Sequence, residues 1–469
     1  MKLSNTFFTL FAASLASAQD CDAKCRGQLG SNWENEQHAS SDFHFYQAPA
    51  KFSSSTKPGT VLAVEEATNF ANYSIPAGLT MSRILYATSD LNGTVLPTSA
   101  YVLWPYTALT GKDASQGYPM VAWAHGTSGV LKGCAPSNYR NLQYHFMAPF
   151  QLALQGMAVV APDYAGLGVS HLPNGDEINH PWGAAPAHAN DLANAIIAAR
   201  SAFPQYLRPS GRFVAMGHSQ GGQTAWAFAE RQVKQPIDGY KGTVSIAPPD
   251  NLIHQIERAL ANPTAPWAAT ILTSQPLLVS AVTAAYPAYN YSGMSDETYD
   301  RWTNIMKPAG ACLPTSALVF ADLTPAALVK ENWTKDASVQ AYGKRIDVGR
   351  KSFKGPLLVL AGESDVVVPH QTVESTVDDT CKLLSKGRVR ESLEMVSFGA
   401  MDHFPVIQAS SSKWMAWIKD RLSDSPRRIR SGCQKSEEAG FRTVFTPKVP
   451  FPNFLEGWAP ASEMWKYLL

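Results

Sequence analysis

The sequence has no excess of charge of either sign and few charged residues overall. Its 469 residues include 39 Lys and Arg against 38 Asp and Glu, a formal net charge of +1, and charged residues make up only 16%. A polybasic surface for nucleic acid or anionic membranes is therefore disfavoured, and we expect no nucleic-acid partner. Beyond residue 18 no apolar run approaches the roughly 18 residues of a membrane span, so we expect no integral membrane segment.

Repeats and low-complexity segments are also missing. Hydrophobic residues make up 45% of the chain, with 32 Gly and 32 Pro, a composition that can bury a large core. The composition therefore excludes a disordered, collagenous or coiled-coil protein and indicates a globular one.

The first 18 residues are typical of a secretory signal peptide. Lys2 precedes a short apolar stretch, and Ala16-Ser17-Ala18 provides small residues for cleavage after Ala18. We expect the protein to be secreted into the extracellular space, with a short N-terminal anchor as the alternative. Four glycosylation triplets fit that compartment, and they begin at Asn72, Asn92, Asn290 and Asn332.

Cysteines are few and even in number. The six are Cys21, Cys25, Cys134, Cys312, Cys381 and Cys433. In an oxidising compartment three disulfides are expected, although six cysteines allow fifteen pairings. Cys21 and Cys25 lack nearby Cys or His partners for zinc, so a local disulfide is favoured over a metal site.

Five short apolar runs alternate with segments whose sequence is typical of helices. The runs cover residues 121–124, 158–161, 213–216, 243–247 and 357–361. Between the second and third, apolar residues at helical spacing predict a helix over residues 187–203. Such alternation predicts an α/β fold, with a mostly parallel central sheet and helices on both faces.

The last two runs start 114 residues apart, at 243 and 357, which is far more than a crossover needs. The intervening sequence is typical of helices interrupted by prolines. We therefore expect a core, first part, over 19–250, a helical cap over 251–345, and a core, second part, over 346–469 that includes a C-terminal tail.

The segment Gly217-His218-Ser219-Gln220-Gly221 contains Gly-x-Ser-x-Gly between an apolar strand and a small-residue helix. That context is typical of a nucleophile elbow, in which a strained turn exposes the serine hydroxyl. Ser219 is the predicted nucleophile, and an idle serine in an ordinary turn is the alternative.

A serine nucleophile needs a base, and the base needs an acid to orient it. In the chain order Ser, acid, His, three histidines follow Ser219: His254, His370 and His403. We favour His403 because His254 lies in the expected cap and His370 lies too close to the acid candidate.

Asp365 is the favoured acid because it follows the run 357–361 directly, at the carboxyl end of a strand. Glu363, Asp402 and Asp250 are the alternatives. For the oxyanion we expect the backbone N–H groups of Gln220 and Thr127, because Thr127 lies in a His-Gly turn after the first run.

On these motifs the chain resembles the fungal secretory lipase family, the one typified by Candida antarctica lipase A, within the α/β-hydrolases. The resemblance rests on Gly217-His218-Ser219-Gln220-Gly221-Gly222, on residues 162–168, on Gly362-Glu363-Ser364-Asp365, and on the long insertion between nucleophile and acid. It implies an α/β-hydrolase fold with a helical lid, no cofactor, and an exported enzyme acting on esters. By position it also implies bridges from Cys134 to Cys312 and from Cys381 to Cys433.

We therefore expect a secreted serine carboxylic ester hydrolase of the lipase or esterase type, acting on a lipophilic ester and in transient contact with a lipid interface. The alternatives are an acyltransferase or esterase for a specialised metabolite, a secreted serine peptidase, and an inactive hydrolase-fold binding protein. Aromatic residues of the tail are expected to pack against the body, or to line a tunnel or flap: Phe441, Phe445, Phe451, Phe454, Trp458, Trp465 and Tyr467.

Overall fold

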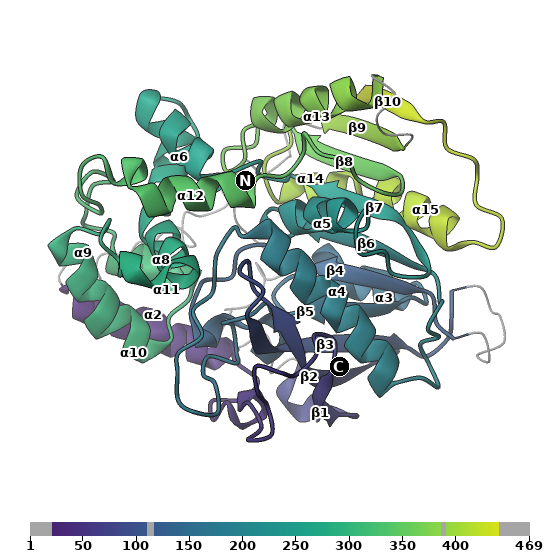
Figure 1. The fold of residues 1–469 in the computed structure, drawn as a ribbon, viewed down its shortest axis with the longest axis horizontal. Helices are drawn as coiled ribbons and strands as arrows, with labels where there is room; N and C mark the ends of the chain where they lie inside the picture. Colours follow the sequence, from purple (N-terminus) through teal and green to yellow (C-terminus); the bar gives the residue numbers. More distant parts are fainter. Residues whose placement is uncertain (1–20, 110–116, 386–390, 440–469) are drawn as a thin grey trace, which may run out of the picture.

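The structure, a computed structural model, describes residues 21–109, 117–385 and 391–439. The predicted signal peptide and the aromatic residues of the C-terminal tail lie outside the described residues. A ten-stranded sheet with the strand order β1-β2-β3-β5-β4-β6-β7-β8-β9-β10 organises the described part of the chain (Figure 1). Its strands are β1 (Val61–Glu65), β2 (Leu79–Ser89), β3 (Val95–Pro105), β4 (Met120–Ala124), β5 (Ala158–Pro162), β6 (Phe213–His218), β7 (Tyr240–Ile246), β8 (Leu357–Gly362), β9 (Ser392–Phe398) and β10 (Gly432–Glu438).

The first strands pair antiparallel, β1 with β2, β2 with β3 and β3 with β5, and every later pairing is parallel. Except for the exposed β10, the parallel strands are short and largely buried on both faces. In β4, Ala122 and Ala124 belong to one hydrophobic cluster, whereas Val121 and Trp123 belong to the other. The alternation follows from the two-residue period of a strand, which sends successive side chains to opposite faces.

Helices cover both faces of the sheet. One cluster holds side chains of α4 (Ala185–Ala202), α5 (Gln220–Arg231) and α13 (His370–Ser385). The other holds side chains of α3 (Pro149–Leu154), α14 (Pro405–Ala409) and α15 (Ser411–Leu422). This three-layer arrangement, visible in Figure 1, confirms the predicted fold class.

The chain between β7 and β8 is a set of helices at one end of the sheet (Figure 1). These helices are α6 (Leu252–Ala261), α7 (Ala268–Leu272), α8 (Gln275–Ala285), α9 (Asp296–Arg301), α10 (Lys307–Ala309), α11 (Leu313–Val319) and α12 (Ala337–Ile346). A π-helical turn at Trp302–Met306 joins α9 to α10. We call this segment the cap.

An N-terminal helix, α2 (Ala23–Gln37), packs against the cap helix α11, which the sequence did not lead us to expect. Its buried Glu34 accepts hydrogen bonds from the backbone N–H groups of Cys312 (2.8 Å) and Thr315 (2.9 Å). Those N–H groups lie at the start of α11, where helical N–H groups lack intrahelical acceptors. The carboxylate of Glu34 therefore caps a helix that is distant in sequence.

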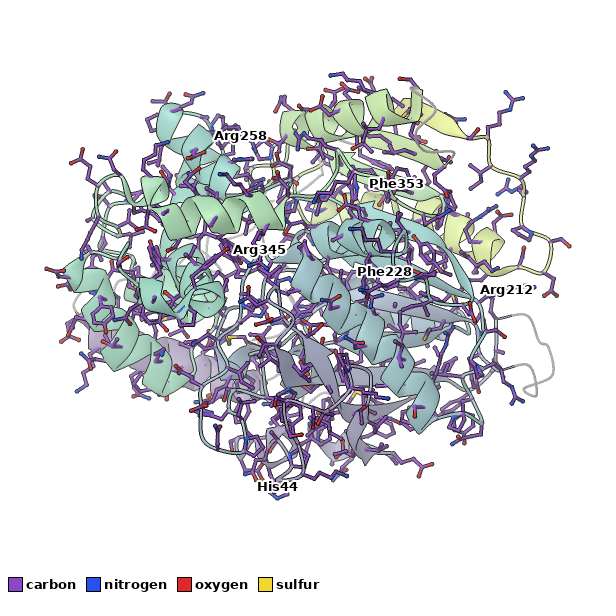
Figure 2. All side chains as sticks on the ribbon, in the orientation of Figure 1. His44, Arg212, Phe228, Arg258, Arg345 and Phe353 are labelled. Atoms are coloured by element: carbon purple, nitrogen blue, oxygen red, sulfur yellow. A yellow bond between two sulfur atoms is a disulfide. The ribbon has the colours of Figure 1, made fainter. Side chains whose placement is uncertain are left out.

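Polar contacts and a disulfide join the cap to the sheet. Tyr342 of α12 donates to the carbonyl of Trp182 (2.6 Å), and Arg345 donates to Asn92 Oδ1 (2.7 Å) in the turn between β2 and β3. Figure 2 labels Arg345 where α12 meets the body of the protein. The cap is therefore held at two places far apart in sequence.

The disulfides of the structure are Cys21–Cys25, Cys134–Cys312 and Cys381–Cys433. The second ties the cap to the loop after β4, and the third ties α13 to β10. These are the local bridge and the two pairings that the family resemblance implies. Within the described ranges, no helix combines the length and the apolar character needed to cross a bilayer.

Candidate active site

Ser219 occupies a strained turn between β6 and α5. Its φ and ψ are 57° and −124°, a conformation that non-glycine residues rarely adopt. Space around the turn exists only for glycine. A Cβ atom on Gly217 would collide with the Gly221 carbonyl, and one on Gly221 would collide with the Ala124 carbonyl. These close approaches explain why the segment needs glycine on both sides of the serine.

Strain also marks the neighbouring strand ends. Besides Ser219, positive φ angles occur at Tyr164, Ala247 and Ala400, which follow β5, β7 and β9. All four residues lie at the carboxyl ends of parallel strands, where ligands bind in open α/β sheets.

The imidazole of His403 is hydrogen-bonded to the carboxylate of Asp365, with 2.8 Å between Nδ1 and Oδ2. Both side chains are almost fully buried. The other oxygen of Asp365 accepts the backbone N–H groups of Val367 (2.8 Å) and Val368 (2.7 Å). Because the carboxylate accepts a hydrogen from Nδ1, the neutral ring keeps its lone pair on Nε2.

The alternative acids are engaged elsewhere. Asp250 pairs with Arg258 at 2.8 Å, and Glu363 is exposed to solvent. Asp402 Oδ1 accepts the backbone N–H groups of Val366 (3.1 Å) and His403 (2.7 Å). Of the four carboxylates that the sequence offered, Asp365 is the one bonded to the His403 ring.

The alternative histidines also lie apart from this pair. His254 on α6 is 3.8 Å from Asp347, and His370, the first residue of α13, contacts Ser397 Oγ at 2.7 Å. His403 instead lines the same cavity as Ser219, although no hydrogen bond joins these two side chains among the described contacts. The structure thus brings Ser219, His403 and Asp365 to one place. His403 is hydrogen-bonded to Asp365, and no hydrogen bond between Ser219 and His403 occurs among the described contacts.

Gln220 and Thr127 also line this cavity. Gln220 is the first residue of α5, so its backbone N–H is one of the four at a helix start that lack an intrahelical acceptor. Thr127 is held through its hydroxyl, which accepts a hydrogen bond from Trp182 Nε1 at 2.9 Å. Both backbones are therefore placed near Ser219.

A stack of buried rings supports the side chain of Gln220. His180 Nδ1 lies 2.9 Å from the carbonyl of Ala165 and must donate to it, so His180 Nε2 accepts from Gln220 Nε2 at 3.2 Å. His188 Nδ1 is a second acceptor at 3.4 Å. Burial lowers the pKa of His180 to about 3 and holds that of His188 well below its usual range, so both rings are neutral.

A second buried chain of hydrogen bonds joins the loops that carry Ser219 and His403. His218, which directly precedes Ser219, lies with Nε2 2.9 Å from the backbone carbonyl of His403. That nitrogen must donate, so Nδ1 accepts the hydroxyl hydrogen of Tyr144 at 2.9 Å. Burial holds the pKa of His218 well below its usual range, which keeps the ring neutral and this direction of donation fixed.

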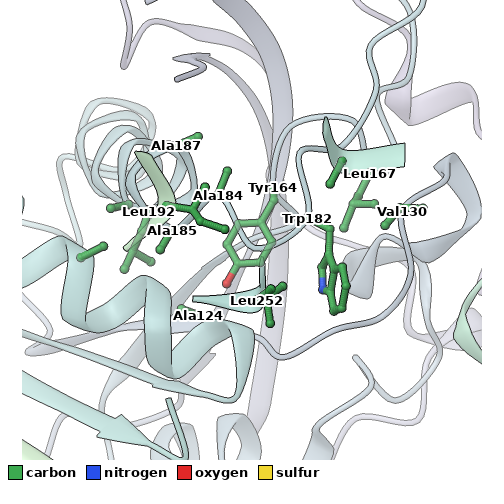
Figure 3. Close-up of a cluster of buried hydrophobic side chains, with 14 of the residues drawn as sticks. Ala124, Val130, Tyr164, Leu167, Trp182, Ala184, Ala185, Ala187, Leu192 and Leu252 are labelled. Atoms are coloured by element: carbon green, nitrogen blue, oxygen red, sulfur yellow. The ribbon is translucent and has the colours of Figure 1, made fainter. Parts of the chain in front are cut away.

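The cavity itself is small and mostly apolar, with a volume of about 140 Å³. Its walls come from the strand ends, from the cap and from the loops after β8 and β9. Figure 3 shows two of the lining residues, Trp182 and Leu252, within a buried cluster that includes Tyr164. The remaining lining residues are Tyr144, Pro249, Gln255, Ile256, Thr270, Ile271, Ser274, Leu277, Leu278, Leu313, Val367, Val368 and Phe404.

A family model described as the alpha/beta hydrolase family matches residues 121–380, more than half of the chain. The chain belongs to the alpha/beta hydrolase family. The matched segment contains Ser219 and Asp365, and His403 follows it. No curated protein sequence matches the chain significantly.

Solved structures of low sequence identity share the fold of this α/β-hydrolase. Candida antarctica lipase A in its closed state is similar with a TM-score of 0.66 and 17% identity, over 87% of this chain and 91% of that one. The rice cell wall degrading esterase LipA from Xanthomonas oryzae has a TM-score of 0.59 and 17% identity, over 79% of this chain and 100% of that one. A putative hydrolase from Legionella pneumophila has a TM-score of 0.58 and 15% identity, over 78% and 98%. The lipase-like α/β-hydrolase fold that the sequence motifs predicted is thereby confirmed.

Sequence reasoning missed several residues that shape the site of this α/β-hydrolase. His218 lies inside the Gly-x-Ser-x-Gly motif, so its position alone could have singled it out. Tyr144, His180, His188 and Gln255 carry no such signal, because their places depend on loops and cap helices whose packing no local pattern predicts.

Proposed function

We propose that this α/β-hydrolase is a serine carboxylic ester hydrolase of the lipase or esterase type, acting on lipophilic esters. The observation that carries the proposal is the shared cavity, in which a serine on a strained elbow meets a histidine already oriented by a buried carboxylate. That arrangement suits acyl transfer through a covalent intermediate.

In the proposed reaction Ser219 Oγ attacks the ester carbonyl and transfers its proton to His403 Nε2. The tetrahedral oxyanion accepts hydrogen bonds from the backbone N–H groups of Gln220 and Thr127. Collapse breaks the bond to the alcohol, which takes the proton from His403 and leaves an acyl-enzyme on Ser219. Water, deprotonated by His403, then releases the carboxylic acid and restores the serine.

The role of Asp365 is to hold the ring of His403 with Nε2 free and to stabilise the imidazolium that forms. The neutral rings beneath Gln220 and beside His403 add no competing positive charge. The mostly apolar cap wall favours a lipophilic substrate, which the similarity of the fold to a lipase and an esterase also supports.

The cavity volume bears on chain length. About 140 Å³ is below the roughly 300–1,000 Å³ of typical ligand pockets, so a short acyl chain fits without displacement of the cap. Long chains require the cap to move, and we expect slower turnover for them in the absence of an interface.

The test is a chain-length series of p-nitrophenyl esters with the wild type, Ser219→Ala and Asp365→Asn. We expect kcat to fall by on the order of 10⁶ for Ser219→Ala and on the order of 10⁴ for Asp365→Asn. Glu363→Gln is the matched control, because it removes the same charge from an exposed position of the same loop. Full activity in Ser219→Ala would exclude the mechanism, and turnover of peptides without esters would favour a peptidase.

We also propose that the protein is exported and glycosylated. The three disulfides support an oxidising compartment, and the acceptor side chains Asn72, Asn92, Asn290 and Asn332 are all exposed. Sequencing the N-terminus of protein collected from the medium should give Gln19, and Met1 would argue against cleavage.

A further inference from the structure

Three polar side chains interrupt the apolar wall that the cap presents to the cavity: Gln255, Thr270 and Ser274. Leu252 and Ile256 of α6 and Leu277 of α8 line it, and Gln255 of α6 lines it between them. Gln255 is only 3% exposed, so its amide is removed from water. A buried amide is costly unless its hydrogen-bonding groups find partners.

The amide of Gln255 lacks that pairing. Its Nε2 has no hydrogen-bond partner among the residues that the structure describes. The Asn251 side chain, at the start of the same helix, is already bonded to Ile253 and His254 through Oδ1 and to Gly343 and Asp347 through Nδ2.

A second glutamine of the cap gives the contrast. Gln275 of α8 is equally buried, but its Nε2 donates to the carbonyl of Pro325 (2.8 Å) and its Oε1 accepts from Trp333 (3.0 Å). Gln275 does not belong to the lining of this cavity and serves to hold the cap together. Gln255 instead belongs to the lining of the cavity that contains Ser219 and His403.

We propose that Gln255 is a substrate-binding residue that recognises an oxygen atom within the acyl chain, remote from the reacting carbonyl. The acceptor would be an ether, carbonyl or hydroxyl oxygen. The inference rests on the proposed function and narrows it to esters of oxygenated acyl chains.

The acyl part is the portion that the cavity must hold. During the reaction the alcohol leaves, whereas the acyl group stays bonded to Ser219 until water releases it. An amide beside that chain gains its missing hydrogen bond only when the chain carries an oxygen. A site built around such a bond discriminates strongly against analogues that lack it, since its polar group is then left unpaired.

The experiment compares p-nitrophenyl hexanoate with analogues in which an oxygen replaces the fourth or fifth carbon of the acyl chain. The variant is Gln255→Met, which keeps the side-chain length and removes the amide. The ratio of kcat/KM for the oxygenated ester to that for the hexanoate should be at least about tenfold higher in the wild type than in Gln255→Met for one of the analogues. Dividing the two ratios cancels the intrinsic reactivity of each ester.

Ile256→Leu is the matched control, since it alters a neighbouring lining residue without touching a polar group, and it should keep the wild-type ratio. The thermal midpoint of Gln255→Met should equal or exceed that of the wild type, because no internal hydrogen bond is lost. Ratios within twofold for both analogues, or a marked drop in the midpoint, would overturn the role of Gln255. Absence of any ester turnover in the wild type would instead contradict the proposed function.

Discussion

His218 and Tyr144 hold two loops that carry the side chains proposed to react, Ser219 and His403. The strand residue before the nucleophile donates to the backbone of His403, and Tyr144 fixes the ring that does so. The rings of His218 and His403 lie 4.5 Å apart, so displacement of one displaces the other. The proposed catalysis therefore depends on a residue that does not contact the substrate.

Replacing His218 by leucine should lower kcat with little change in KM. The lost hydrogen bond leaves the His403 carbonyl unpaired, at a cost of about 1–3 kcal/mol, which corresponds to roughly a tenfold to hundredfold loss of rate if the loop shifts. His218→Gln can still donate to that carbonyl through its amide and should recover part of the rate. Steady-state kinetics on a short ester measures both constants.

A purely structural role for His218 would give a different pattern. The thermal midpoint would fall for both variants, and the glutamine would not recover activity more than it recovers stability. Equal kcat values for His218→Leu and the wild type would remove the positioning role.

At the scale of elements, the disulfide between Cys134 and Cys312 is the covalent link between cap and body. The two cysteines are 178 residues apart, and Cys312 is the N-cap of α11. In the chain-entropy account, closing so long a loop stabilises the folded state by roughly 5 kcal/mol, against roughly 2 kcal/mol for a four-residue separation.

The double variant Cys134→Ser, Cys312→Ser should therefore lose more stability than Cys21→Ser, Cys25→Ser, whose cysteines are 4 residues apart. Urea unfolding followed by fluorescence of the buried tryptophans gives the two midpoints. If loss of the Cys21–Cys25 bridge lowers the urea midpoint more than loss of the Cys134–Cys312 bridge, the length of the closed loop does not determine how much each bridge stabilises the protein.

The same scale shows which elements the sequence could predict. The strands β4 to β8 were visible as apolar runs because both of their faces are buried, and the helix expected over 187–203 is α4 (Ala185–Ala202). The strands β2 and β3 were not visible. Their buried faces include polar residues such as Arg83 and Ser99, which find partners in Glu65 (2.6 Å) and Asp163 (2.6 Å). Pairing that makes such burial possible depends on tertiary structure and leaves no apolar pattern.

Strand β10 escaped prediction for another reason. Its sequence, Gly432–Glu438, is exposed and largely polar, and it joins the sheet through parallel pairing with β9 and through the bridge from Cys433 to Cys381. Within the site, chain order and motif context led to Ser219, Asp365 and His403. Gln255 could not be singled out, because its role depends on an unpaired buried amide that only the packed cap reveals.

At the scale of the whole molecule, the pH dependence of the free energy of unfolding is set by buried histidines and by the buried carboxyls that act against them. Burial lowers the pKa of six histidines below the ordinary value of about 6.5. The six are His38, His125 and His145, each at about 4, His180 at about 3, and His188 and His218, whose pKa values are held well below the ordinary one. Below pH 6.5 these rings bind protons in the unfolded chain but stay neutral in the folded protein, so acid favours unfolding.

Five described carboxyls whose pKa burial raises act in the opposite direction: Glu34, Asp163, Asp191, Glu230 and Glu391. Burial raises the pKa of Asp191 and of Glu230 to about 7, so between about pH 4 and 7 the folded protein keeps protons that the unfolded chain has lost. Their contribution to stability falls as the pH rises through that range. Six histidines oppose these five carboxyls, and each proton taken up on unfolding changes the free energy of unfolding by about 1.4 kcal/mol per pH unit.

The free energy of unfolding should therefore rise from pH 4.5 to about pH 6.5 and stop rising above it. Urea titrations at half-unit steps of pH measure the slope, and two variants with opposite effects identify its source. His38→Gln removes a buried ring whose pKa burial lowers to about 4, and it should flatten the slope by about one proton. Asp191→Asn removes an opposing carboxyl and should steepen the slope by a similar amount. A stability that falls between pH 4.5 and 6.5, or two variants that shift the slope in the same direction, would show that burial of these rings does not govern the acid response.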